Sequence, residues 1–157
     1  MSSTLVLKEG TGDRDKLTWK RAHGQSTTPS EYSDPAVNAT YTFCLFAGSD
    51  NAVVAAAELP PDAVHWEPTS KGFTYRDPAA AVDGIARVKL TADEMDSAGI
   101  TLAGRGAGLD IAMPPFDLPI TTQLVNSQSN VCWAASYDAA DVRRNGAGKL
   151  SVKANAH

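Results

Sequence analysis

The histidines are the side chains of this sequence best suited to general acid–base chemistry near neutral pH. The chain contains His23, His65 and His157, the last of which is the final residue and is therefore expected to be poorly ordered. A hydrolase would need a nucleophile beside one of the other two and a carboxylate to orient it. The sequence has no Gly-x-Ser-x-Gly elbow, the turn that presents a serine nucleophile in many hydrolases. We therefore expect solvated or loop-packing histidines, and no residue is assigned a catalytic role.

Acidic side chains form three groups in loop-like segments, and such groups can bind calcium, which prefers several hard oxygen ligands. The groups are Asp13 with Asp15, then Asp93, Glu94 and Asp96, and then Asp138 with Asp141. None has the twelve-residue spacing of an EF-hand. We expect solvated loop charges as the default, with a structural calcium as the alternative, for which the first and third groups would supply the ligands because they lie beside turn residues. We expect no other cofactor.

Aromatic residues are only 7% of the chain, and rings exposed on a surface can stack on the apolar faces of sugars. Four rings lie in loop-like stretches, close to prolines or in a short strand-like run, and we predict that they bind a ligand. They are Trp66, Tyr75, Tyr32 and Tyr137. The other two tryptophans, Trp19 and Trp133, lie within strand-like apolar runs, which favours core positions.

The glycine-rich run at 104–108 superficially resembles a nucleotide-binding loop. Its spacing differs from the dinucleotide fingerprint, and the residues that follow, with Pro114 and Pro115, cannot begin a long helix. A phosphate cradle needs the amides at such a helix N-terminus. We therefore expect a flexible turn or bulge at this run and no phosphate site.

The two cysteines, Cys44 and Cys132, lie in apolar runs that we interpret as strands. They could be two buried free thiols, because cysteine often serves as a small core residue. They could also form a disulfide, which would suit a secreted β-sandwich and would close a long loop. With the scattered histidines they lack the ligand spacing of a zinc site.

The composition excludes several classes of protein. The chain has 157 residues, 43% of them hydrophobic and 20% charged, which is typical of one globular domain and not of a disordered chain. A formal net charge of −4 argues against nucleic acid as the main partner. No segment approaches the roughly 20 apolar residues of a membrane helix, so we expect no membrane insertion.

Short runs of alternating apolar and polar residues, broken by Gly, Pro, Asn and Asp, dominate the sequence. Leu5 and Leu7 alternate with polar or outward positions, and Leu17 and Trp19 do the same in the next run. No apolar repeat of helical period persists over three turns. We predict a single all-β domain over 1–157, a Greek-key or immunoglobulin-like β-sandwich of roughly nine to eleven short strands, with short helical turns near 77–81 and 91–94. A closed barrel is the alternative.

Several segments of the sequence also resemble a known type of module. They are Leu5-Val6-Leu7-Lys8, Lys16-Leu17-Thr18-Trp19-Lys20, the run from Tyr41 to Phe46, the run from Gly72 to Asp77, the run from Asp83 to Leu90, Gln123-Leu124-Val125-Asn126 and Cys132-Trp133-Ala134-Ala135. Across most of the chain they resemble an all-β module of large extracellular proteins in bacteria such as the myxobacteria. That module has no established activity. The resemblance implies export, a Cys44–Cys132 pairing and an accessory position, and it transfers no catalytic residue.

Three hypotheses for the function follow. The first is a non-catalytic extracellular binding or accessory module that recognises a polysaccharide or another cell-surface component. The second is a structural or adhesive spacer that self-associates. The third is a small hydrolase-like enzyme. The N-terminus has no signal-peptide pattern, and an extracellular or periplasmic location is nevertheless expected from the predicted fold and from the resemblance.

Overall fold

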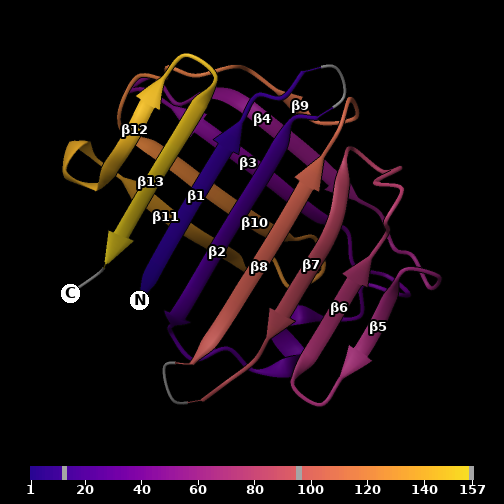
Figure 1. The fold of residues 1–157 in the computed structure, drawn as a ribbon. Helices are drawn as coiled ribbons and strands as arrows, with labels where there is room; N and C mark the ends of the chain where they lie inside the picture. The colour runs from indigo at the N-terminus through magenta and orange to yellow at the C-terminus, as the bar shows by residue number, and fades with distance from the viewer. Residues whose placement is uncertain (12–13, 95–96, 156–157) are drawn as a thin grey trace.

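The computed structural model describes residues 1–11, 14–94 and 97–155, and it confirms the predicted all-β sandwich. Within these described residues, thirteen strands form two antiparallel sheets, one of eight strands and one of five. The two sheets lie face to face, with the eight-stranded sheet in front in Figure 1. In that view the strands of the rear sheet cross behind those of the front sheet.

The spatial order of the strands differs from their order along the chain. From one edge to the other, the larger sheet contains β12 (Val142–Gly146), β13 (Lys149–Asn155), β1 (Ser2–Lys8), β2 (Lys16–Gly24), β8 (Ala98–Arg105), β7 (Ile85–Thr91), β6 (Gly72–Arg76) and β5 (Trp66–Thr69). The smaller sheet contains β11 (Cys132–Tyr137), β10 (Ile120–Asn126), β3 (Tyr41–Ala47), β4 (Ala52–Leu59) and β9 (Asp110–Ile111). Two 3-10 turns, η1 (Pro29–Tyr32) and η2 (Ala139–Asp141), lie in the loops.

Each sheet contains a Greek-key order of four strands. In the smaller sheet the order is β10-β3-β4-β9, and in the larger sheet it is β13-β1-β2-β8. In both, the fourth strand along the chain returns to lie beside the first, which gives the spatial order 4-1-2-3 of a Greek key. Between some of these strands the chain crosses to the opposite sheet, so the two Greek-key orders are interleaved along the sequence. One result is that the first and last strands pair, with Ser2 opposite Asn155 (Figure 1).

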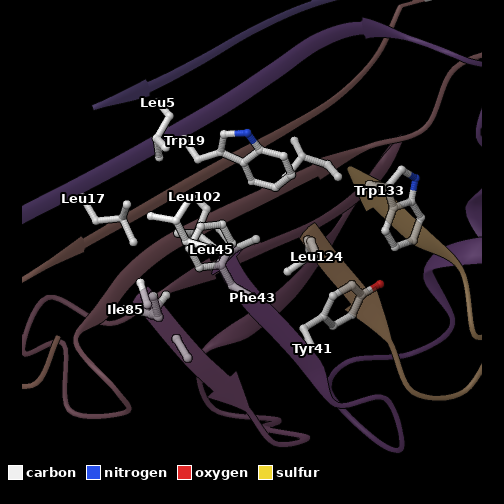
Figure 2. Packing of buried hydrophobic residues seen from close by; sticks show 14 of the residues in the cluster. Leu5, Leu17, Trp19, Tyr41, Phe43, Leu45, Ile85, Leu102, Leu124 and Trp133 are labelled. Atoms are coloured by element: carbon white, nitrogen blue, oxygen red, sulfur yellow. The ribbon is translucent and has the colours of Figure 1, made fainter. Parts of the chain in front are cut away.

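The core forms between the sheets because each strand alternates buried and outward side chains. In β1 the buried positions include Leu5 and Leu7, and in β2 they are occupied by Leu17 and Trp19. Figure 2 shows the side chains of Leu5, Leu17 and Trp19 pointing toward Phe43 and its neighbours on the opposite sheet. The Trp19 and Phe43 rings pack at a centroid distance of 5.7 Å. One continuous cluster of buried residues therefore joins the two sheets.

The structure differs from the predicted elements in two respects. It has thirteen strands where roughly nine to eleven were predicted, because short segments without an apolar alternation, such as the two residues of β9, pair only in the folded sheet. The predicted helical turns at 77–81 and 91–94 do not form. The Asp77 carboxylate does accept hydrogen bonds from the amides of Ala79 and Ala81, but the segment remains a turn. Thr91 ends β7 instead.

The cysteines are not bonded, so the expected disulfide is wrong. Cys44 lies on β3 and Cys132 on β11, and β10 lies between those two strands. Adjacent strands are about 4.8 Å apart, and a disulfide needs Cα atoms within roughly 7 Å, so a bond across an intervening strand is geometrically excluded. Cys44 is half-buried and Cys132 exposed, both on the outer side of the smaller sheet, which also differs from the expectation of two buried thiols.

Candidate functional site

The four aromatic residues predicted to bind a ligand are all buried, so the predicted solvent-facing aromatic platform is wrong. Their exposed fractions are at most 2%. They are Trp66, Tyr75, Tyr32 and Tyr137. A ring without a solvent-facing side cannot stack on a sugar. Trp19 and Trp133 are also buried, as predicted.

The buried tyrosines connect distant parts of the chain. The Tyr32 hydroxyl, at the end of η1, donates a hydrogen bond to the backbone oxygen of Thr91 at 2.9 Å. The Tyr137 hydroxyl is hydrogen-bonded to Oγ of Ser3, which also accepts a hydrogen bond from Nε1 of Trp19 at 3.1 Å. Burial raises the pKa of both tyrosines, which keeps their hydroxyls protonated. Their role is to hold the structure together.

Trp66 and Tyr75 pack against each other beneath the edge of the larger sheet, with ring centroids 5.2 Å apart. Burial raises the pKa of Tyr75 to about 12. The Tyr75 hydroxyl and the Trp66 indole nitrogen have no hydrogen-bond partner among the described residues. Most buried polar groups in proteins are hydrogen-bonded, so these two polar atoms are exceptions. They are buried because the rings that carry them pack in the core.

The described members of the predicted calcium groups, Asp15, Asp138 and Asp141, accept hydrogen bonds from backbone amides. Asp13 lies outside the described residues, and Asp15 accepts a hydrogen bond from the Gly10 amide at 3.0 Å. Asp138 and Asp141 cap η2, where the Asp141 carboxylate accepts a hydrogen bond from the Asp138 amide at 2.9 Å. Among residues 1–11, 14–94 and 97–155, no three His, Cys, Asp or Glu side chains are arranged to hold a metal.

One histidine lies between two carboxylates. Nδ1 of His65 is 2.6 Å from Oδ2 of Asp62, and its Nε2 is 3.9 Å from Oδ1 of Asp77. The hydrogen bond between His65 and Asp62 raises the pKa of His65 and lowers the pKa of Asp62. No hydroxyl or thiol of the described residues is hydrogen-bonded to the His65 ring, so a nucleophile is not paired with it. His23 is exposed at the end of β2, and His157 lies outside the described residues.

The glycine-rich run forms a turn, as predicted, and β9 follows it instead of a helix. Gly104 is the last inward-facing residue of β8, where a Cβ would lie 2.9 Å from the backbone oxygen of Gly84 and 2.7 Å from the Leu109 side chain. Gly106 has a φ of 87°, a left-handed conformation that favours glycine. Close packing between β8 and the 80–85 loop, together with the left-handed turn at Gly106, explains why this run is rich in glycine.

Charged side chains are distributed unequally between the two sheets. The five strands of the smaller sheet contain no lysine or arginine. The outward side of the larger sheet contains ten of the chain's 14 lysine and arginine residues, and Glu67 on the edge strand β5 is the one acidic residue in its eight strands. We call this surface the cationic face. Its residues are Lys8, Lys16, Lys20, Arg76, Arg87, Lys89, Arg105, Arg144, Lys149 and Lys153.

Four of these residues form a continuous row across four neighbouring strands. Arg105 on β8 is opposite Lys16 on β2, Lys16 is opposite Lys8 on β1, and Lys8 is opposite Lys149 on β13. We call this row the cationic ladder. Neighbouring strands are about 4.8 Å apart, and like charges directly opposite each other destabilise a sheet. None of the salt bridges among the described residues involves these four side chains.

A second row combines lysines with threonines. From β6 to β13 the residues directly opposite one another alternate strictly between the two types. They are Thr74, Lys89, Thr101, Lys20, Thr4 and Lys153. We call this row the Thr–Lys ladder. Its cations lie on every second strand, about 10 Å apart, with a hydroxyl between each pair. The cationic face therefore presents ammonium, guanidinium and hydroxyl donors in regular rows.

This surface is not among the sequence-based predictions, although a signal for it exists. Basic residues occur an even number of positions apart within strand-like runs, as in Lys16 with Lys20, Arg87 with Lys89 and Lys149 with Lys153. Residues at such spacing point to the same side of a strand. The net charge of the whole chain concealed the pattern, because the acidic residues lie mainly in loops.

No protein-family model, curated protein or solved structure matches this chain. Among the described residues, the helical segments are turns of four and three residues, too short to cross a membrane. The properties of the cationic face are therefore the basis for a functional proposal.

Proposed function

We propose that this chain is a non-catalytic binding module that attaches to an acidic polysaccharide through the cationic face. The observation that carries this proposal is the cationic ladder, where four basic residues lie in direct cross-strand contact positions without an ion-pair partner among the described residues. Such an arrangement costs stability in the free protein, and a bound polyanion would relieve it.

The chemistry of the face favours a polysaccharide over a nucleic acid. Proteins that bind single-stranded nucleic acids usually stack bases on exposed aromatic rings. The aromatic residues in the strands of the larger sheet, such as Trp19, Trp66 and Tyr75, point into the core. The outward positions between the lysines hold threonine hydroxyls, which donate and accept hydrogen bonds with sugar hydroxyls. The alternation in the Thr–Lys ladder suits a polymer in which anionic groups alternate with hydroxyl-bearing units.

The proposed module is non-catalytic, and its proposed location is extracellular or periplasmic. A module of an exported protein, outside the cell or in the periplasm, would encounter acidic polysaccharides of cell surfaces. A spacer domain would have no need for the row of like charges, so the spacer hypothesis predicts that removing them changes no binding property.

Isothermal titration calorimetry with polygalacturonate, dextran sulfate and neutral dextran tests the proposal. We expect the two anionic polymers to bind, neutral dextran not to bind, and the affinity to fall steeply with salt because bound counterions are released. The Lys8→Gln/Lys16→Gln variant should bind about tenfold more weakly and with a shallower salt dependence.

A matched control lowers the net charge equally on the other sheet. Gln123 and Ser136 point outward from β10 and β11, and the Gln123→Glu/Ser136→Glu variant should bind like the unmodified chain. Equal losses in both variants would mean that only net charge matters and would contradict the proposal. Stronger binding to single-stranded DNA than to either acidic polysaccharide at equal charge would assign the face to nucleic acids instead.

A further inference from the structure

The cationic face contains a groove of about 360 Å³ between the turn after β5 and the outward sides of β6 and β7. Four basic side chains line it, namely Lys71, Arg76, Arg87 and Lys89. Threonine and serine hydroxyls, including that of Thr74, form much of the remaining wall, and none of the described residues that line the groove is acidic. It is thus a concave site with cationic and neutral donors.

Two arginines lie directly opposite each other at this groove. Arg76 on β6 is the cross-strand neighbour of Arg87 on β7, and neither takes part in a salt bridge among the described residues. Both are exposed. The carboxylate that follows Arg76 in the chain, Asp77, is 4% exposed and accepts hydrogen bonds from backbone amides. The two guanidinium groups therefore face solvent in the same groove without a neutralising partner from the described part of the chain.

The acidic groups near the groove are few. Lys71 is paired with Asp93 at 3.3 Å, which leaves three of the four cations without an ion-pair partner among the described residues. Glu67 lies on β5 opposite Thr74 and does not line the groove. The remaining positive charge is concentrated at Arg76, Arg87 and Lys89.

We propose that this groove binds a tetrahedral oxyanion ester, a sulfate or phosphate group carried by the polysaccharide, in preference to a carboxylate. This inference rests on the proposed function and specifies its ligand class. A guanidinium presents several N–H donors in a fixed plane and binds oxyanions through two parallel hydrogen bonds. A sulfate or phosphate ester has three terminal oxygens, enough for two such forks and a hydroxyl, whereas a carboxylate has two. Two arginines beside threonine hydroxyls therefore match the tetrahedral group better.

Two variants separate the geometry of the groove from its charge. Arg76→Lys/Arg87→Lys preserves both positive charges and removes both planar forks. Lys8→Gln/Lys16→Gln removes charge from the cationic ladder and leaves the groove unchanged. Each is measured by calorimetry against dextran sulfate, a phosphorylated dextran and polygalacturonate, at matched charge per sugar.

We expect the unmodified chain to bind the two ester polymers about tenfold more tightly than polygalacturonate, because the third terminal oxygen of an ester accepts one more charge-assisted hydrogen bond than a carboxylate can, and one such bond is worth about a factor of ten. The arginine-to-lysine variant should lose this preference while still binding all three polymers. The ladder variant should weaken all three to a similar degree and keep the preference. Comparing sulfated with phosphorylated dextran identifies which ester the groove takes.

A chain with no preference, or a preference that survives Arg76→Lys/Arg87→Lys, overturns the assignment of the groove while leaving polyanion binding intact. If the chain binds no polymer, the proposed function fails. Inorganic sulfate and phosphate then still test the groove, because their binding should shift the NMR signals of the Arg76 and Arg87 side chains. Unshifted signals would overturn the groove site as well.

Discussion

Lys16 on β2 lies directly opposite Lys8 on β1, so two like charges face each other across adjacent strands. Arg105 lies on the other side of Lys16, which places one cation between two others. Sequences that fold well usually avoid such local conflicts, and the conflicts that persist tend to lie at functional sites. The repulsion among these residues gives the first prediction.

Replacing Lys16 with glutamine should stabilise the protein. Removing one charge from the cationic ladder should raise the free energy of unfolding by about 0.5 kcal/mol at low salt, because like charges opposite each other are relieved. The gain should shrink at high salt, where exposed charges are screened. Urea denaturation at two salt concentrations measures both effects. Lys20→Gln is the control: the cross-strand neighbours of Lys20 are Thr4 and Thr101, so it should give no comparable gain. Equal gains in the two variants would contradict the proposed repulsion.

Two buried tyrosines should respond oppositely to loss of the hydroxyl. The Tyr41 hydroxyl donates a hydrogen bond to the backbone oxygen of Tyr32 at 2.7 Å, so Tyr41→Phe should cost about 1 to 3 kcal/mol of stability because it leaves a buried acceptor unpaired. The Tyr75 hydroxyl has no partner among the described residues, so Tyr75→Phe should be neutral or stabilising. Thermal and urea unfolding compare the pair. A loss for Tyr75→Phe as large as that for Tyr41→Phe would mean that the Tyr75 hydroxyl has a bonding partner in solution.

The hydrogen bond between His65 and Asp62 should make stability depend on pH in a defined window. The folded-state pKa of His65 is raised, so its contribution is complete below the ordinary histidine pKa and is lost as the pH rises through the raised value. The pKa of Asp62 is lowered, so its contribution is complete above the ordinary aspartate pKa and is lost as the pH falls through the lowered value. The pair therefore stabilises the fold most in mildly acidic solution.

NMR titration of the His65 ring protons tests this directly. Asp62→Asn should lower the pKa of His65, and it should reduce the difference in unfolding free energy between mildly acidic and neutral to slightly alkaline solution. The same His65 pKa in both proteins would show that the hydrogen bond does not form in solution.

Both cysteines should react as free thiols. Without reductant, the unfolded chain should release two equivalents of chromophore from Ellman's reagent, one for Cys44 and one for Cys132. In the folded protein Cys132 should react first, since it is exposed and Cys44 is half-buried. Partial desolvation of the sulfur atoms raises the pKa of both thiols, so both reactions should accelerate as the pH increases. Failure to detect thiols in the unfolded chain would indicate a disulfide and a different pairing of β3, β10 and β11.

Most of the strands, and the side of each that is buried, could be predicted from the order of the amino acids. Alternation placed Leu5, Leu7, Leu17 and Trp19 in the core, and the same period placed Lys16 and Lys20 on the outside. A two-residue period depends only on local geometry, so it is readable without knowledge of the fold. Together with the lack of any long segment of helical period, this alternation also predicted the β-sandwich.

The identity of neighbouring strands, and with it the candidate site, depended on the folding of the whole chain. Lys16 and Arg105 are far apart in the sequence but directly opposite in the larger sheet. The cost of closing a loop grows only slowly with its length, so separation along the chain does not select a partner. The same reason explains the errors about Cys44 and Cys132, which β10 separates, and about Tyr32, whose loop segment is drawn against the core. Periodicity fixes the face of a strand, whereas packing of the whole chain chooses what stands beside it.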